Sequence, residues 1–292
     1  MDMDRERNEE RDMDGEGQSG ALDWQGYLEV AQSLAREAGD YLRRHLDDRH
    51  LIRFKGEIDI VTEADQAAEE MIIGAIRSRC PGHDILAEES PATSHGSPFR
   101  WIIDPLDGTT NYSHGYPVFC VSIALEYKGV CVLGIVYNPM LAEMFTAVKG
   151  QGAFLNGKEI AVSRTAKMSR CLLATGFPYD IRHSSDNNLN YFEVMAMNAQ
   201  AIRRAGSAAL DLAYVAAGRF DGFWELKLKP WDMAAGCLLV REAGGRVSDI
   251  HGAEFTLDAP HVAASNGLIH DRMLTILGGA ARSGTVFHDA SV

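Results

Sequence analysis

The segment from Trp101 to Asn111 constrains this chain most, because an apolar run ends there in two carboxylates three residues apart. Trp101 to Ile103 are typical of a buried strand. Pro105 has no N–H to donate to a sheet, so it predicts the end of that strand. Asp104 and Asp107 are therefore expected at the carboxyl end of a strand, the edge at which open α/β sheets bind their ligands.

The two carboxylates predict a bound cation. Held close together at neutral pH they repel each other, so either one is protonated or a cation lies between them. Oxygen ligands without clustered His or Cys favour a hard ion such as Mg²⁺. Gly108 would allow backbone N–H groups to approach an anion, and Thr109 and Thr110 add hydroxyl donors. A divalent cation beside a phosphate-binding turn indicates phosphoryl transfer.

Helical and strand patterns alternate along the chain, which predicts a layered α/β fold. Apolar residues at helical spacing, with capping signals, predict helices at residues 24–46, 62–79, 188–200, 207–217 and 231–243. Strands are predicted at residues 84–87, 99–103, 119–127, 130–137, 144–148, 171–175 and 201–204. Tight hairpin turns are expected at 128–129 and 155–158.

Composition excludes several classes of protein. The chain carries 28 Lys and Arg against 41 Asp and Glu, a net charge of −13, which argues against general nucleic-acid binding. Five scattered Cys without a C-x-x-C motif are typical of reduced thiols, so we expect a cytoplasmic protein. No apolar run approaches the ~20 residues of a membrane span, and no secretory signal is visible.

The chain is expected to form one domain over residues 21–280, with halves at about 21–165 and 166–280. Residues 1–20 are acidic and poor in large apolar groups, which predicts a disordered leader. Residues 281–292 are expected to be a flexible tail.

Asp104-Pro105-Leu106-Asp107-Gly108-Thr109-Thr110-Asn111 resembles the signature of the inositol monophosphatase family of Mg²⁺-dependent, lithium-sensitive phosphatases. Three further segments match the family in order, namely 87–90 (Ala-Glu-Glu-Ser), 204–212 and 231–245. The resemblance covers about residues 22–270, and residues 203–249 look most like bacterial inositol-1-monophosphatases. It implies a five-layer αβαβα sandwich, and we expect a homodimer.

The resemblance also implies two or three Mg²⁺ ions. Glu88 and Asp104 would share one ion with the Leu106 carbonyl, and Asp104, Asp107 and Asp232 would hold a second. Taken alone, Glu88 could be a surface acid, and Asp232 could serve only to complement a helix dipole. Glu88 would also help to position the attacking water.

Thr109 and Asp65 are further catalytic candidates by resemblance. Asp65 would accept a hydrogen bond from Thr109, whose hydroxyl contacts the nucleophilic water. A capping box at Thr62 and Asp65 explains the acid as well, and both roles can coexist. The resemblance places a Lys near the metals, but the segment around Lys55 is one residue shorter than in some members of the family, so the resemblance does not settle whether Lys55 contributes.

The substrate is expected to contact residues on both sides of the metals. Glu225 would accept a hydrogen bond from a hydroxyl, and Gly206, Ser207 and Ala208 would line the polyol. Close helix packing explains these three small residues equally well. The full expected set of substrate contacts is Asp107, Gly108, Thr109, Gly206, Ser207, Ala208, Glu225 and Asp232.

Two other motifs are rejected. Gly152 to Glu159 nearly matches a phosphate-binding P-loop, but Glu159 replaces the Ser or Thr that binds Mg²⁺, and a hairpin turn explains the glycines better. The 10 His residues include no H-E-x-x-H, so a zinc protease of that class is excluded.

The sequence therefore predicts a Mg²⁺-dependent phosphatase that hydrolyses inositol 1-phosphate, or a similar small polyol or sugar monophosphate, by metal-activated water. Fructose-1,6-bisphosphatase, histidinol-phosphatase and phosphoadenosine phosphatase activities are the alternatives within the resemblance. Thr110 and Asn111 favour the inositol branch over the phosphoadenosine branch. A non-catalytic interaction protein on the same fold is the alternative from a different class.

Overall fold

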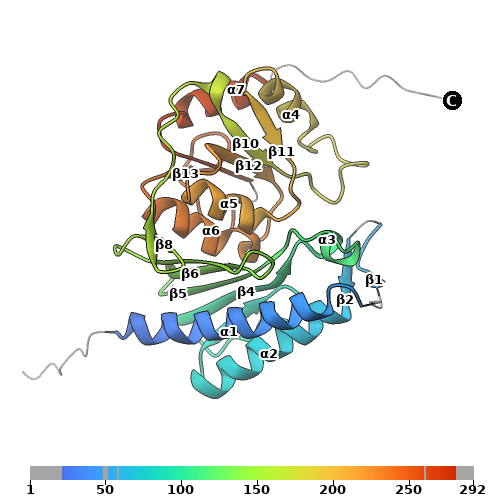
Figure 1. Cartoon of the computed structure of the whole chain (residues 1–292), viewed down its shortest axis with the longest axis vertical. Helices are drawn as coiled ribbons and strands as arrows, with labels where there is room; N and C mark the ends of the chain where they lie inside the picture. The colour runs from blue at the N-terminus through green and yellow to red at the C-terminus, as the bar shows by residue number, and fades with distance from the viewer. Residues whose placement is uncertain (1–21, 49–51, 58, 260, 281–292) are drawn as a thin grey trace, which may run out of the picture.

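The computed structural model describes residues 22–48, 52–57, 59–259 and 261–280. Helices and sheets alternate in five layers, in the order helix, sheet, helix, sheet, helix (Figure 1). The expected αβαβα sandwich is confirmed. The expectations for residues 1–20 and 281–292 lie outside the described residues.

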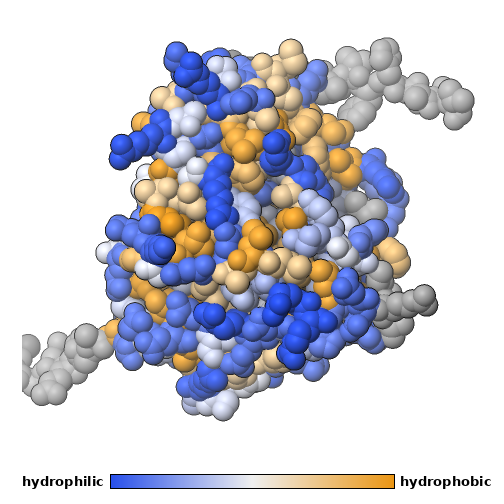
Figure 2. Space-filling view, viewed as in Figure 1, coloured by the Kyte–Doolittle hydropathy of each residue, from blue (hydrophilic) through white to orange (hydrophobic). Residues whose placement is uncertain are grey.

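The first helical layer packs on one face of a seven-stranded sheet. Helices α1 (Trp24–His45) and α2 (Glu63–Arg79) form this layer, and α1 buries one apolar stripe that includes Leu34 and Leu42. Its exposed face is hydrophilic, as the lower part of Figure 2 shows. The strands, in spatial order, are β3 (Asp84–Ala87), β4 (Phe99–Asp107), β5 (Cys120–Tyr127), β6 (Val130–Asn138), β7 (Glu143–Val148), β8 (Ala153–Leu155) and β9 (Lys158–Ile160).

Helices α5 (Ala208–Ala216) and α6 (Pro230–Glu242) form the middle layer and contribute to the apolar core shared by both sheets. The second sheet has the order β11 (Ala201–Arg203), β10 (Leu172–Thr175), β12 (Gly222–Leu226), β14 (His261–Ser265) and β13 (Arg246–Ser248). The outer layer holds α4 (Leu189–Ala196) and α7 (His270–Ala280). Smaller elements are β1 (Ile52–Phe54), β2 (Ile60–Thr62), α3 (Thr109–Ser113) and a 3₁₀ turn (Met168–Arg170).

The predicted end of strand β4 is wrong. The strand continues through Pro105 to Asp107. Its pairing with β5 is irregular between Asp104 and Asp107, and this irregularity accommodates the proline. At such a bulge the ladder does not need the N–H that proline lacks. The N–H of Leu106 instead donates to the Asp104 carboxylate at 3.0 Å. The irregularity therefore places both acids at the end of the strand.

The second half of the chain was predicted less completely. Helix α4 ends at Ala196 rather than near residue 200, and the Asn198 side chain donates to the Val194 carbonyl at its end. Strands β12, β13 and β14 and helix α7 were not predicted. All five residues of β12 are buried, so its sequence lacks the alternation that marks a half-exposed strand.

Two compositional expectations can be compared with the structure. None of the five Cys forms a disulfide, and four are buried. Among the described residues, no helix combines the length and apolar character needed to cross a bilayer.

Candidate active site

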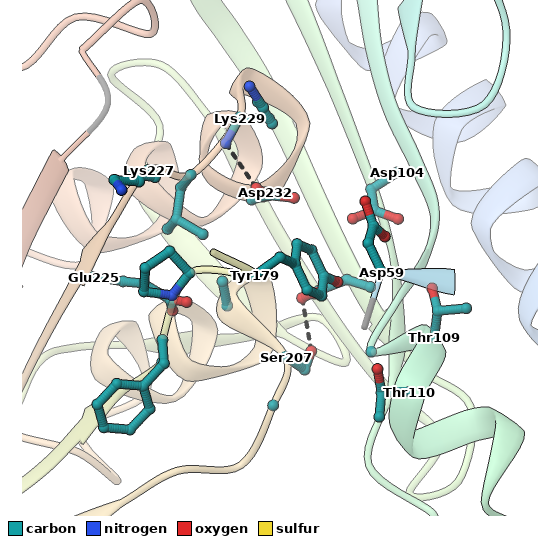
Figure 3. Close-up of a pocket in the computed structure, with 18 of the residues that line it drawn as sticks. Asp59, Asp104, Thr109, Thr110, Tyr179, Ser207, Glu225, Lys227, Lys229 and Asp232 are labelled. Atoms are coloured by element: carbon teal, nitrogen blue, oxygen red, sulfur yellow. Dashed lines mark hydrogen bonds between the residues drawn. The ribbon is translucent and has the colours of Figure 1, made fainter. Parts of the chain in front are cut away.

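A cavity of about 410 Å³ collects most of the residues that the sequence singled out. Its walls come from the ends of β4, β10 and β12 and from the first turns of α3, α5 and α6 (Figure 3). Strands β3 and β4 are parallel, as are β10 and β12, so the carboxyl ends of each pair lie at one edge of its sheet. The cavity thus lies where two sheets end.

The first sheet supplies Glu88, Asp104, Leu106 and Asp107. Glu88 follows β3 directly, and the other three lie at the carboxyl end of β4. The side chain of Asp104 is almost fully buried, and one of its oxygens is fixed by the Leu106 N–H. The irregular pairing of β4 therefore orients this carboxylate as well as placing it.

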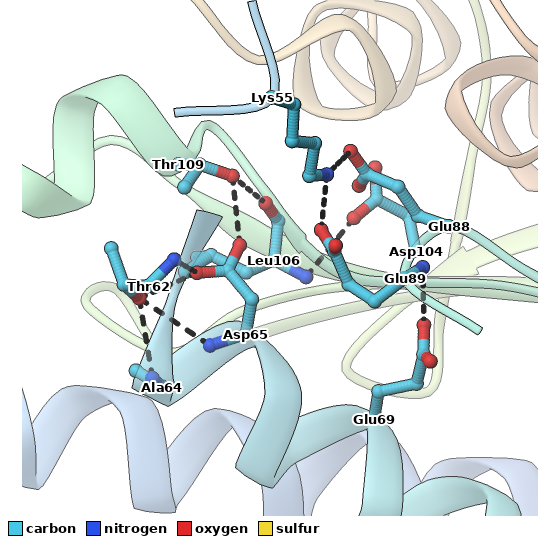
Figure 4. A network of polar contacts seen from close by, with 10 residues as sticks. All are labelled: Lys55, Thr62, Ala64, Asp65, Glu69, Glu88, Glu89, Asp104, Leu106 and Thr109. Atoms are coloured by element: carbon cyan, nitrogen blue, oxygen red, sulfur yellow. Dashed lines mark hydrogen bonds and ion pairs between the residues drawn. The ribbon is translucent and has the colours of Figure 1, made fainter. Parts of the chain in front are cut away.

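Lys55 lies in the same cluster. Its ammonium group donates to Glu88 Oε1 at 3.0 Å and to Glu89 Oε1 at 2.5 Å (Figure 4). The backbone N–H of Glu89 donates to Glu69 on α2 at 2.8 Å, which anchors this segment. Burial lowers the pKa of Lys55, but the two glutamates more than offset it, so the net shift is upward. Lys55 stays charged.

Asp107 and Asp232 join the first sheet to the middle helices. Asp107 Oδ2 accepts hydrogen bonds from the Ser207 hydroxyl and the Ala209 N–H, both at 2.7 Å. Asp232 lies in the first turn of α6, and its Oδ2 accepts from the Lys229 N–H at 2.7 Å. Ser207, expected to line the polyol, is thus also bonded to an acid of the cluster. Asp232 therefore caps α6, and its role as a metal ligand stays a prediction.

Thr109 and Asp65 are in direct contact, although 44 residues separate them. The Thr109 hydroxyl lies 2.9 Å from Asp65 Oδ1 and 3.1 Å from the Leu106 carbonyl (Figure 4). The other oxygen of Asp65 accepts from the Thr62 N–H at 2.8 Å and closes the capping box of α2. Asp65 therefore serves both as a helix cap and as the partner of Thr109.

The four acids Glu88, Asp104, Asp107 and Asp232 share an unfavourable electrostatic environment. Burial raises the pKa of each, and for Asp104 the other three acids raise it further. The pKa of Glu88 rises to about 7, against the opposing effect of Lys55. Removing water from several carboxylates at one place favours either protons or a cation there.

The chemistry of these donors fits a hard cation. One oxygen of Asp104 and one of Asp232 are held by backbone N–H groups, and the second oxygen of each accepts no hydrogen bond from a described residue. Among the described residues, however, no three His, Cys, Asp or Glu side chains converge closely enough to hold a single ion. The ligand set taken from the family resemblance therefore stays a prediction.

Gly108 and Asn111 fix the turn between β4 and α3. Gly108 has φ +104°, and a Cβ atom there would lie 2.9 Å from the Val118 carbonyl. Only glycine accepts this conformation without strain. The Asn111 amide donates to the carbonyls of Val118 at 2.7 Å and Ala205 at 2.8 Å, so it ties the turn to the segment before α5. Sequence reasoning gave Asn111 no such role.

The opposite wall carries Glu225 with Gly206, Ser207 and Ala208. Glu225 lies in β12 and is 9% exposed, yet its carboxyl group accepts no hydrogen bond from a described residue. It lies against Gly176, where a Cβ atom would fall 2.1 Å from Glu225 Oε1. Burial raises the pKa of Glu225 to about 8. Asp211 and Arg204 line the same wall and were not predicted as site residues. Both lie in the 204–212 segment that matches the family, but the sequence does not show which of its side chains face the cavity.

Comparison with known proteins places these motifs in context. The model of the inositol monophosphatase family matches residues 23–280. An inositol-1-monophosphatase of Synechocystis is 46% identical over 253 residues, which cover 86% of this chain and 88% of the relative. A protein of Pseudomonas aeruginosa named Nus factor SuhB is 45% identical and is covered over 96% of its length.

Solved structures agree with the layered fold. The inositol monophosphatase of Anabaena superposes with a TM-score of 0.81 at 42% identity, covering 88% of this chain and 97% of that one. The family match spans all five layers and every motif that builds the cavity. The chain belongs to the inositol monophosphatase family.

Proposed function

We propose that this protein is a Mg²⁺-dependent phosphatase that hydrolyses inositol 1-phosphate or a similar small polyol or sugar monophosphate. The observation that carries the proposal is the gathering of four carboxylates and the Gly108 turn around one cavity. Relatives named inositol-1-monophosphatase at 43% to 46% identity support it.

In this proposal Glu88, Asp104 and the Leu106 carbonyl hold one ion, and Asp104, Asp107 and Asp232 hold another. When bound, such ions lower the pKa of a water molecule and stabilise the leaving oxygen. The raised pKa values of the acids support the assignment, because a cation would offset their mutual repulsion.

Thr109 and Glu88 orient the attacking water. The Thr109 hydroxyl donates a hydrogen bond to Asp65, so the lone pairs of its oxygen are free to accept a hydrogen bond from water. Glu88 lines the cavity beside Asp104 and would accept a hydrogen bond from the same water. The backbone at Gly108 and Thr109 faces the cavity and would hold the phosphate.

The wall that holds Glu225 would recognise the alcohol part of the substrate. Glu225 has a buried carboxyl group without a protein partner, and it lines the cavity beside Gly206 and Ala208. A hydroxyl of the substrate would supply the missing hydrogen bond. Asp107 and Asp232, between the two walls, would face both the ions and the substrate.

The relatives named Nus factor SuhB, at 44% to 45% identity, favour a second candidate, in which the chain acts through an interaction rather than turnover. The two functions can coexist on one fold. Because all four acids are retained here, we place the phosphatase function first.

Phosphate release distinguishes the two candidates. Purified protein is stripped of metals and assayed with and without Mg²⁺ on inositol 1-phosphate, fructose 1,6-bisphosphate, histidinol phosphate and 3′-phosphoadenosine 5′-phosphate. We expect Mg²⁺-dependent release, greatest with inositol 1-phosphate. Absence of release from every ester, by folded protein with added Mg²⁺, would contradict the phosphatase and leave the interaction role.

A further inference from the structure

Asp211 is a buried acid without a partner. It lies in the first turn of α5 and is 1% exposed. Its Oδ1 is the single buried side-chain nitrogen or oxygen atom without a hydrogen bond among the residues that the structure describes. No described residue donates to its Oδ2 either. A buried polar group left unpaired destabilises a fold, so it requires an explanation.

Apart from Glu225, the other buried acids among the described residues are hydrogen-bonded within the protein. Asp65 and Asp107 each accept at least two hydrogen bonds. Asp221, which is 6% exposed, accepts from the Ser163 hydroxyl at 2.5 Å and from the Leu172 N–H at 2.7 Å. Hydrogen bonds within the protein therefore compensate for the burial of these carboxyl groups. Asp211 differs because it lines the cavity and its carboxyl group has no such hydrogen bond.

The surroundings of Asp211 point to a polar, uncharged ligand. It lines the cavity on the wall that holds Glu225, the second buried acid without a protein partner. The charged groups that act on Asp211 are Glu225 on β12, Asp107 on β4 and Arg204 before α5. Burial and the two acids raise its pKa well above the ordinary value, against the opposing effect of Arg204. A protonated carboxyl group can both donate and accept.

We propose that Asp211 is a specificity-determining residue that hydrogen-bonds a hydroxyl of the alcohol part of the substrate, next to the hydroxyl bound by Glu225. The inference rests on the proposed phosphatase function and narrows its substrate class. Two unpaired acids on one wall fit an ester whose alcohol carries at least two neighbouring hydroxyls. An alcohol without them leaves both acids unsatisfied, and such a site discriminates against it.

The test compares two substitutions on two substrates. Asp211→Ala removes both oxygens, whereas Asp211→Asn keeps an acceptor and a donor in the same shape. Each is assayed on inositol 1-phosphate and on 4-nitrophenyl phosphate, whose aromatic ring carries no hydroxyl group. We expect Asp211→Ala to lose roughly 10-fold in kcat/KM on inositol 1-phosphate, the effect of one ordinary hydrogen bond. Asp211→Asn should recover most of this loss, and the aryl phosphate should be unaffected.

Asp221→Ala is the matched control, because Asp221 is similarly buried but bonded within the protein and outside the cavity. It should lower Tm and leave the ratio of kcat/KM between the two substrates unchanged. Asp211→Ala should change that ratio without lowering Tm, because no protein hydrogen bond is lost.

The outcomes separate this inference from the proposed function. If wild-type protein hydrolyses neither ester, the proposed function fails before Asp211 is tested. If wild type is active and Asp211→Ala keeps the wild-type ratio, the inference is wrong and the phosphatase stands. An equal loss on both substrates with a lowered Tm would also overturn it, by making Asp211 structural.

Discussion

The two walls of the cavity treat their acids differently. On the catalytic wall, defined by Glu88, Asp104, Asp107 and Asp232, every acid accepts a hydrogen bond from the protein. On the polyol wall, defined by Asp211 and Glu225, neither acid does. The first wall is held in place before any ligand arrives, as preorganised catalysis requires. On the second wall, a bound polyol would supply the missing hydrogen bonds if the proposed function is correct. Changes on the catalytic wall should therefore affect all esters, and changes on the polyol wall only hydroxylated ones.

The largest effect is expected from Asp104→Asn, which removes the acid assigned to both ions. We expect kcat to fall by roughly 1,000-fold or more on inositol 1-phosphate and on 4-nitrophenyl phosphate alike, because the lost interaction belongs to the transition state. Steady-state kinetics over a range of Mg²⁺ concentrations measure this. Asp84→Asn, at the opposite end of β3, is the control and should retain turnover. A near-normal kcat in Asp104→Asn would show that Asp104 does not hold the catalytic ions.

A smaller effect on both substrates is expected from Thr109→Ala, which removes the hydroxyl between Asp65 and the cavity. Misplacing the attacking water can cost roughly 100-fold, so kcat should fall by about that factor. Thr109→Ser keeps the hydroxyl and should recover most of the rate. If the Ser variant were as slow as the Ala variant, the role of Thr109 would be packing, since the two differ in that hydroxyl.

Glu225→Gln tests whether a change on the polyol wall affects only the hydroxylated ester. It keeps the shape of the side chain but weakens the hydrogen bond that a substrate hydroxyl would donate to the ionised carboxylate in the complex, typically worth ~1.5–3 kcal/mol. We expect kcat/KM on inositol 1-phosphate to fall roughly 10- to 150-fold. The loss on 4-nitrophenyl phosphate should be much smaller, and activation by Mg²⁺ should be unchanged. Equal losses on both esters would place Glu225 in the catalytic wall.

The smallest effect concerns the pH dependence of stability. The ordinary pKa of Glu225 is 4.5, and burial raises it to about 8 in the fold. Between these values the unfolded chain is ionised and the folded chain protonated, so the contribution of Glu225 to stability falls as pH rises through this window. Glu225→Gln should therefore gain stability over wild type between pH 4.5 and pH 8, with no further gain above.

Urea denaturation of the metal-free proteins at pH 4.5, 6, 7, 8 and 9 measures this difference. A difference in the free energy of unfolding that stayed constant across the series would show that Glu225 does not change its protonation state on folding. The polyol wall would then carry a charge rather than a neutral acid.

Local signals determined most of the elements. Strand β3 was predicted at its observed bounds, and α1, α2, β5, β6 and β7 within one residue at either end. Amphipathic spacing and caps act over a few residues, so they can be read without knowing the fold. The motifs at Glu88, Asp104 to Asn111 and Asp232 likewise indicated the four acids that line one cavity, because each motif is recognisable within a few residues of sequence.

Contacts between distant segments were decided by the tertiary structure alone. Pro105 fits inside β4 because β5 leaves an irregular step opposite it. Lys55 meets Glu88 and Glu89 across more than 30 residues, and Asp211 loses its partners because α5 turns it toward the cavity. The sequence around these positions does not show which distant groups they meet. Burial and hydrogen bonding depend on which surfaces pack together, and that is settled only when the sheets and helices assemble.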